Sequence, residues 1–179
     1  MTTTKQSAAK TKQSATTTDQ IAHETTGVWG ADVASGARQF LQPLVVNLTA
    51  LHVEGKQAHW HVRGSGFIGV HELLDLYVAH VREWADLVAE RVVALGLPVD
   101  GRIRTVGKDT VIPQLKDGFQ SVPDTIAQVI EQIDATLKVL HESMDELEDI
   151  DVASQDVLVE IERGLVKDRW FLHAHIAED

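Results

Sequence analysis

The segment KQAHWHVRGSGFIGVHELLD, residues 56–75, places a glycine-rich turn between two stretches in which apolar residues recur at helical spacing. It therefore predicts the end of one long helix, a short connection and the start of a second helix. The segment also carries His59 on the first of these helices, and His71 and Asp75 on the second. Since residues four apart share one face of a helix, the side chains of His71 and Asp75 lie together.

Two further acids, Asp86 and Glu90, follow on the second predicted helix, again four residues apart. Imidazole and carboxylate groups together are the ligands that iron, zinc and manganese accept. The pattern His59, His71, Asp75, Asp86 and Glu90 therefore predicts a metal site. Taken alone, each of these residues is more typical of a helix surface, and the prediction depends on their common register.

The spacing along the second helix also predicts an oligomer. At about 100° per residue, Asp86 returns to within about 20° of the face of Asp75. At a rise of 1.5 Å per residue, however, the two carboxylates lie roughly 16 Å apart along the axis. Metal–ligand bonds are about 2 Å long, so one ion cannot bridge them. If they share a centre, the second pair must come from another copy, packed antiparallel across a two-fold axis.

Composition limits the remaining classes of function. The chain has 179 residues, 44% of them hydrophobic, which suits one domain with a real core. It has no cysteine, so disulfides and thiolate metal sites are excluded, and it lacks the apolar runs of a signal peptide or a membrane span. We expect a cytoplasmic protein. A formal net charge of -11 argues against a folded surface that binds nucleic acid.

The N-terminal region differs from the rest in composition. Residues 1–18 contain three lysines and no acid, and no large apolar residue precedes Ile21. Such a segment cannot bury enough surface to offset its ordering entropy. We expect a flexible tail over residues 1–35, with Trp29 as its anchor on the body, and a folded domain over residues 36–179.

The domain is predicted to be all-α, because no strand-like alternation competes with four long helical patterns. The predicted segments are a first helix at about 42–62, a second at about 68–95, a crossover at 96–122 with a short helix near 111–119, a third helix from Pro123 and a fourth after Asp151. Antiparallel neighbours would need only a short loop. The long crossover therefore predicts a ferritin-like bundle, in which the third helix starts at the far end.

The segment 56–75, followed by Asp86-x3-Glu90-Arg91, closely resembles the Dps family of mini-ferritins, and the resemblance extends from about residue 40 to the end. It implies a hollow dodecamer of four-helix-bundle subunits, each with a short extra helix in the crossover. It also implies ferroxidase centres of two irons between subunits, with His59, His71 and Asp75 from one subunit and Asp86 and Glu90 from its partner. Fe2+ would be oxidised there, preferably by hydrogen peroxide, and stored as a ferric mineral core. No histidine has a glutamate three residues before it, which separates the chain from larger ferritins.

Residues beside the ligand pattern have two interpretations each. Trp60 is either a packing residue or, as the family implies, a neighbour of the irons that intercepts radicals. Lys56 is either a solvated lysine or a hydrogen-bond donor to the water or acids of the centre. His61 stands where the family commonly has asparagine, and we expect it to form a hydrogen bond rather than bind metal. No matching pattern assigns the other histidines, His52, His80, His141, His173 and His175.

Two surface features extend the resemblance. Asp151, Asp156 and Glu160 match family positions that line an acidic three-fold pore, through which Fe2+ would enter. The alternative is that these acids only complement the dipole of the fourth helix. Lys5, Lys10 and Lys12 give the tail the positive charge that DNA binding requires, since an assembled acidic shell should repel phosphate. The alternative for the tail is a purely solubilising segment.

Two functions of different classes follow. The first is an iron-oxidising and iron-storing protein that consumes Fe2+ and hydrogen peroxide and protects DNA from oxidative damage. The second is a nucleoid-associated, DNA-binding structural protein with a vestigial or structural metal site. The complete set of five ligand positions favours the first, while the three tail lysines leave the second open beside it.

Overall fold

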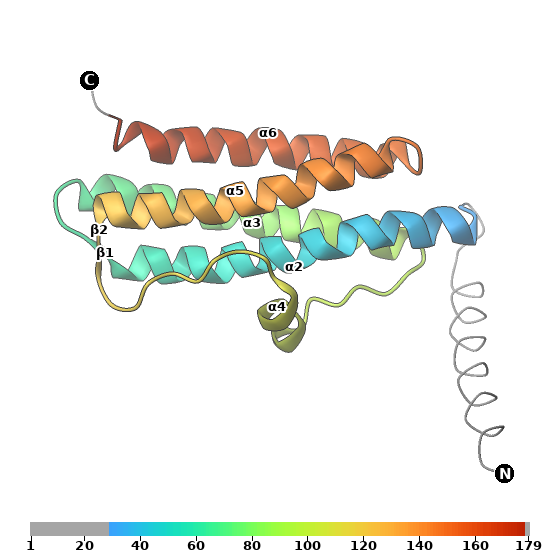
Figure 1. Ribbon diagram of the computed structural model, residues 1–179, viewed down its shortest axis with the longest axis horizontal. Coiled ribbons are helices and arrows are strands. Elements are labelled where there is room, and N and C mark those ends of the chain that lie inside the picture. Colours follow the sequence, from blue (N-terminus) through green and yellow to red (C-terminus); the bar gives the residue numbers. More distant parts are fainter. Residues whose placement is uncertain (1–28, 178–179) are drawn as a thin grey trace, which may run out of the picture.

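The computed structural model describes residues 29–177 of the chain, which form a bundle of long helices (Figure 1). The elements in chain order are α2 (Ala31–His61), β1 (Val62–Arg63), α3 (Phe67–Ala94), α4 (Ile103–Asp109), β2 (Gln120–Ser121), α5 (Val122–Leu147) and α6 (Val152–Ala174). The four long helices lie side by side, and the short helix α4 lies outside them against α2 (Figure 1). This arrangement confirms the predicted all-α, ferritin-like bundle with an extra helix in the crossover. No helix among residues 29–177 is both long and apolar enough to cross a membrane.

Helix α3 matches its prediction to within one residue at each end. Its buried side chains include Val70, Leu74, Tyr77 and Val81, which recur at spacings of three and four residues and form one apolar face. The helix ends before Gly96, whose φ of 86° lies in the left-handed region that glycine adopts without strain. Burial of one face and a glycine stop were both visible in the sequence, which explains the agreement.

Helix α2 begins earlier than expected. The prediction placed its start at Gln42, next to Pro43, because proline suits the first turn of a helix. The structure instead begins α2 at Ala31 and continues it through Pro43, with Ala34 and Ala37 fully buried. These small residues continue the apolar stripe upstream, and their burial offsets the hydrogen bond that an interior proline removes. The helix thus includes residues 31–35, which the sequence analysis assigned to the tail.

Trp29 lies just before α2 and packs against the core, as predicted for the anchor of the N-terminal segment. The guanidinium carbon of Arg91 lies 5.3 Å from the centre of the indole ring, a cation–π distance. The anchor therefore joins the start of α2 to the last turns of α3.

Two-residue strands, which the sequence did not predict, fix the ends of the crossover. Val62 pairs with Gln120 and Arg63 with Ser121, in parallel. This pairing brings the start of α5 beside the end of α2, so the connection from α3 must run back along the bundle (Figure 1). The length of the crossover predicted that the third helix starts at the far end of the bundle, and this position is confirmed.

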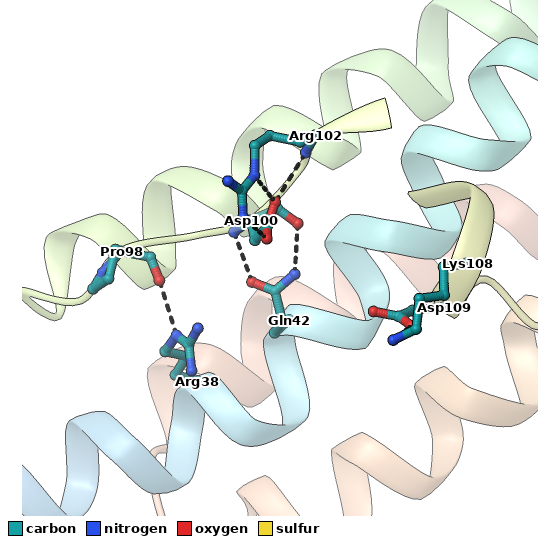
Figure 2. Close-up of polar contacts among 7 residues, drawn as sticks. All are labelled: Arg38, Gln42, Pro98, Asp100, Arg102, Lys108 and Asp109. Atoms are coloured by element: carbon teal, nitrogen blue, oxygen red, sulfur yellow. Dashed lines mark hydrogen bonds and ion pairs between the residues drawn. The ribbon is translucent and has the colours of Figure 1, made fainter. Parts of the chain in front are cut away.

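Figure 2 shows how the first part of the crossover is held on α2. Gln42 donates from its side-chain amide to the carbonyl of Asp100 at 2.8 Å and accepts from the Asp100 amide at 2.9 Å. The Arg102 guanidinium forms a hydrogen-bonded ion pair with the Asp100 carboxylate and holds its pKa well below the ordinary value. These contacts place the start of α4 directly after Arg102.

The predicted position of the short helix, residues 111–119, was wrong. The structure places the helix at Ile103–Asp109, and the buried side chain of Asn47 ends it. The side-chain Oδ1 of Asn47 accepts from the Thr110 hydroxyl at 3.0 Å and from the Val111 amide at 3.1 Å, which draws this part of the chain onto α2. Pro113 also disfavours helix in the residue before it.

Close packing between α3 and α6 at Gly164 leads to a stability prediction. A methyl group at Gly164 would collide with the indole ring of Trp84, so we expect Gly164→Ala to destabilise the protein by about 1–3 kcal/mol. Gly107→Ala in α4 is the matched control, because a methyl group there meets nothing within 4 Å. It should leave the thermal unfolding midpoint unchanged or raise it. Equal midpoints for the two variants would contradict the packing described.

Candidate metal centre

The side chains of His59 and His71 are each hydrogen-bonded to the backbone carbonyl of the other residue. The Nδ1–H of His59 donates to the carbonyl of His71 at 2.9 Å, and the Nδ1–H of His71 donates to the carbonyl of His59 at 3.0 Å. The two rings are stacked, with centroids 3.7 Å apart and planes 20° apart. Because a carbonyl only accepts hydrogen bonds, both Nδ1 atoms carry a proton, so in the neutral form of each ring Nε2 is the nitrogen whose lone pair can bind a metal ion.

Asp75 lies next to this histidine pair and is held by Lys56. The Lys56 ammonium donates to Asp75 Oδ1 at 2.6 Å, and the same oxygen lies 3.7 Å from His59 Nδ1. The hydrogen bond from Lys56 lowers the pKa of Asp75, followed by smaller effects that include the two histidines. The Asp75 carboxylate is therefore ionised at neutral pH and half exposed, in a form that can bind a cation.

Asp86 and Glu90 are exposed further along α3. Asp86 lines a groove of about 710 Å³ between α2, α3 and the first part of the crossover, together with His52 and Glu83. Within residues 29–177, no three histidine, aspartate or glutamate side chains come close enough to hold a metal ion. A single copy thus presents the histidine group with Asp75 at one place and the acid pair at another.

Trp60 and His61, which follow His59, have different environments. Trp60 is 62% exposed, so its indole is not part of the core of a single copy. The Nδ1–H of His61 donates to the carbonyl of Gly118 at 2.9 Å, and its ring lies 5.5 Å from that of Phe119. His61 thus joins the end of α2 to the end of the crossover by a hydrogen bond, in agreement with its predicted role.

The three predicted pore acids differ in their contacts. Asp151, which precedes α6, accepts a hydrogen bond from the Arg91 guanidinium at 2.6 Å and is also bonded by the hydroxyl of Ser154. Its side chain is only 9% exposed, whereas Asp156 and Glu160 are exposed one turn apart on α6. Asp151 is therefore engaged within the bundle, and the free acidic face of α6 consists of Asp156 and Glu160. The pore itself stays a prediction.

Two polar pairs that the sequence did not predict join α3 to α6 and to the residue just before it. The first joins Arg91 to Asp151, and in the second His80 Nδ1 donates to Asp168 at 2.9 Å. Asp168 is 3% exposed, and this burial raises its pKa against the opposing effect of His80. The partners in each pair lie far apart in the sequence, so no local pattern predicts the pairing. The sequence marks only Arg91, which directly follows Glu90 in the motif. Lys5, Lys10 and Lys12 lie outside the described residues.

Comparison with known proteins agrees with this architecture. Residues 39–179 match the family model of the Ferritin-like domain. A DNA protection during starvation protein of Mycolicibacterium smegmatis is 35% identical over 147 residues, which cover 80% of this chain and 78% of the relative. The structure of Dps from Microbacterium arborescens in the high iron form has a TM-score of 0.77 and 52% identity, and the match covers 82% of this chain and 95% of that one.

The chain belongs to the Dps family. A structure of Dps from Mycobacterium smegmatis, with a TM-score of 0.81 and 32% identity, also aligns over 86% of this chain and 94% of its own. The match to the Ferritin-like domain begins at residue 39, inside α2, so it covers most of the bundle and all five predicted ligand positions.

The Arg91–Asp151 pair leads to a prediction on pH dependence. Burial alone would raise the pKa of Asp151, but hydrogen bonds from Ser154 and Arg91 outweigh it and hold the pKa below the ordinary value. The pair's contribution to stability is therefore present above about pH 4 and is lost as the pH falls through the folded-state pKa. We expect Asp151→Asn to cost about 1–2 kcal/mol at pH 7 and progressively less below pH 4.

Thermal unfolding of both proteins between pH 6 and pH 3 measures this difference. Asp156→Asn is the control, since Asp156 is an exposed acid on the same helix, and it should leave the midpoint unchanged across this range. A constant difference between wild type and Asp151→Asn at every pH would show that the carboxylate charge is not what stabilises the pair.

Proposed function

We propose that the chain oxidises Fe2+ with hydrogen peroxide at metal centres that two copies share, and that it stores the ferric product. The observation that carries this proposal is the division of the ligands in a single copy. The stacked His59 and His71 rings, whose Nδ1 atoms are bonded to carbonyl groups, lie next to Asp75, while Asp86 and Glu90 are exposed too far along α3 to join them. A second copy, packed antiparallel, would bring the two groups together.

The side chains have distinct parts in this reaction. The neutral imidazoles of His59 and His71 would bind Fe2+ through Nε2, since their Nδ1 protons are already donated to carbonyl groups. Asp75, Asp86 and Glu90 add negative charge, which favours the ferric product more than the ferrous substrate. Lys56 would release the Asp75 carboxylate when a cation arrives and would then be a positive group at the edge of the centre.

The overall reaction needs two ferrous ions. Each Fe2+ gives up one electron, the O–O bond of hydrogen peroxide breaks, and two protons are taken up to form two molecules of water and two Fe3+. Because both electrons reach the peroxide at one centre, no hydroxyl radical is released. Detoxification of peroxide and removal of Fe2+ are then one reaction, which would protect DNA indirectly.

The proposal extends to the assembly. We propose the hollow dodecamer of the family, with a cavity for the ferric mineral and with Asp156 and Glu160 as the acids that attract Fe2+ at an entry pore. Their exposure on α6 supports this role, while the engagement of Asp151 by Arg91 leaves them as the free acids of the predicted trio. Trp60, which is exposed beside His59, would lie at the interface near the metal centre.

Complementation between two inactive variants tests the shared centre. We expect His59→Ala/His71→Ala and Asp86→Asn/Glu90→Gln to oxidise Fe2+ no faster than buffer when each is assembled alone. A mixed two-fold pair contains one centre with all five ligands intact and one centre that keeps only Asp75. Dissociation of a 1:1 mixture and reassembly should therefore restore about a quarter of the wild-type centres.

The measurement is the rate of Fe2+ oxidation at limiting hydrogen peroxide, on particles whose mass shows full assembly. The same two variants mixed without dissociation are the control and should stay inactive. Activity of either variant alone at the wild-type rate would refute the ferroxidase proposal. Inactive mixed particles would refute the sharing of ligands between copies.

A second proposed function is direct binding of DNA, at the nucleoid in the cytoplasm, through the N-terminal tail. Lys5, Lys10 and Lys12 occur without any acid in residues 1–18, in a chain whose formal net charge is -11. Several relatives of this chain carry the name DNA protection during starvation protein. Many tails on one particle would bind by multivalency, and the contact would weaken steeply with salt because it releases counterions.

Gel-shift assays at two salt concentrations test the tail. We expect the assembled protein to bind duplex DNA at low salt, and the triple variant Lys5→Gln/Lys10→Gln/Lys12→Gln to lose that binding. This variant keeps the length of the tail, and its iron oxidation rate should equal that of wild type. DNA binding that survives both the triple substitution and deletion of residues 1–18 would refute the proposal.

A further inference from the structure

Arg91 directly follows Glu90, and its side chain is held on three sides. Its Nη2 donates to Asp151 at 2.6 Å, its Nε donates to Ser154 Oγ at 3.0 Å, and its guanidinium lies 5.3 Å from the Trp29 ring. The arginine side chain is 15% exposed and Ser154 is fully buried. These contacts come from α6 and from the segment before α2, so one side chain ties three parts of the bundle together.

The place of this contact in α3 matters because a helix is least constrained near its end. Glu90 lies one turn before the last helical residue, Ala94, and the carbonyls of the final turn accept hydrogen bonds from the amides of residues 95–97, which follow the helix. Asp86 lies a further turn inside. Val88 and Val92 are fully buried and hold this part of α3 against the core, but apolar contacts have no preferred direction. Hydrogen bonds from a side chain of fixed geometry add a directional constraint on the rotation of the helix end.

The contacts of Arg91 supply that direction. Consecutive side chains on a helix point about 100° apart, so a clamp on the Arg91 side chain fixes where Glu90 points. An arginine that donates through both Nε and Nη2 cannot rotate without losing one of the two bonds. Glu90 itself is exposed, so within one copy its direction depends on the backbone beneath it.

We propose that Arg91 is a positioning residue for the metal centre. Its bonds to Asp151 and Ser154 fix the last turns of α3 so that the Glu90 carboxylate stands where a second copy's histidine pair needs it. This inference rests on the proposed function, because it assigns Glu90 to a shared centre. It gives Asp151 a part in metal binding through Arg91, distinct from a role in lining a pore.

Anaerobic titration of the assembled protein with Co2+ tests the inference without any oxidation step, since the visible absorption of Co2+ reports its ligands. We expect Arg91→Met to weaken Co2+ binding by roughly 10-fold, a typical effect of losing a group that orients a metal ligand. Arg91→Lys keeps the charge but not the paired bonds, so it should fall between Arg91→Met and wild type. Asp151→Asn should act in the same direction and serves if Arg91→Met does not assemble.

Two comparisons separate positioning from general stabilisation. Arg169→Met breaks the Arg169–Asp134 ion pair between α5 and α6, away from Glu90, and should lower the unfolding midpoint while leaving Co2+ affinity unchanged. The double variant Glu90→Gln/Arg91→Met should bind Co2+ no more weakly than Glu90→Gln alone, because Arg91 acts through Glu90.

The outcomes are distinct. Unchanged Co2+ affinity in assembled Arg91→Met, or losses that add in the double variant, would overturn the positioning role and leave the proposed function intact. Unchanged Co2+ affinity in Glu90→Gln alone would overturn the shared centre, and the positioning role with it. Losses of Co2+ affinity that do not add in the double variant, together with an unchanged Co2+ affinity in Arg169→Met, would establish the proposal.

Discussion

The exchange of hydrogen bonds between His59 and His71 is the contact on which the candidate centre depends. It closes the end of α2 onto the start of α3 across the glycine-rich turn, and it gives a donor to the His59 carbonyl, which lies in the last turn of α2. The same two bonds fix the tautomer of both rings. One interaction therefore both joins the two helices and leaves both Nε2 atoms free for metal, so a change to either histidine would alter fold and chemistry together.

The sequence predicted most of the bundle because its helices carry their own signals. Helix α3 shows a continuous apolar stripe and a glycine stop, and α5 begins with Ser121, which caps the helix by accepting from the Asp124 amide. The predictions failed where residues far apart in the sequence determine the bounds of a helix. The start of α2 depends on alanines that the rest of the core buries, and the place of α4 depends on hydrogen bonds from Asn47. No local pattern encodes either contact.

The candidate site divides in the same way. The five predicted ligand positions could be proposed from the sequence because four of them share one helix and their spacing is fixed by its geometry. The orientation of the imidazoles and the pairing of Lys56 with Asp75 required the folded chain. Asp151 shows the limit most clearly, since it looks like Asp156 and Glu160 in sequence. Only its burial against Arg91 separates a structural carboxylate from two free ones.

Because Lys56 already contacts Asp75, cation binding at this carboxylate is an exchange of one positive group for another. A cation that takes Oδ1 of Asp75 replaces an ammonium group of charge +1 that lies 2.6 Å away. A sodium or potassium ion gains no charge by this exchange, whereas a divalent ion gains one unit. The lysine thus acts as a built-in competitor, one that would keep the abundant monovalent salts of a cell from holding the site against scarce divalent metal.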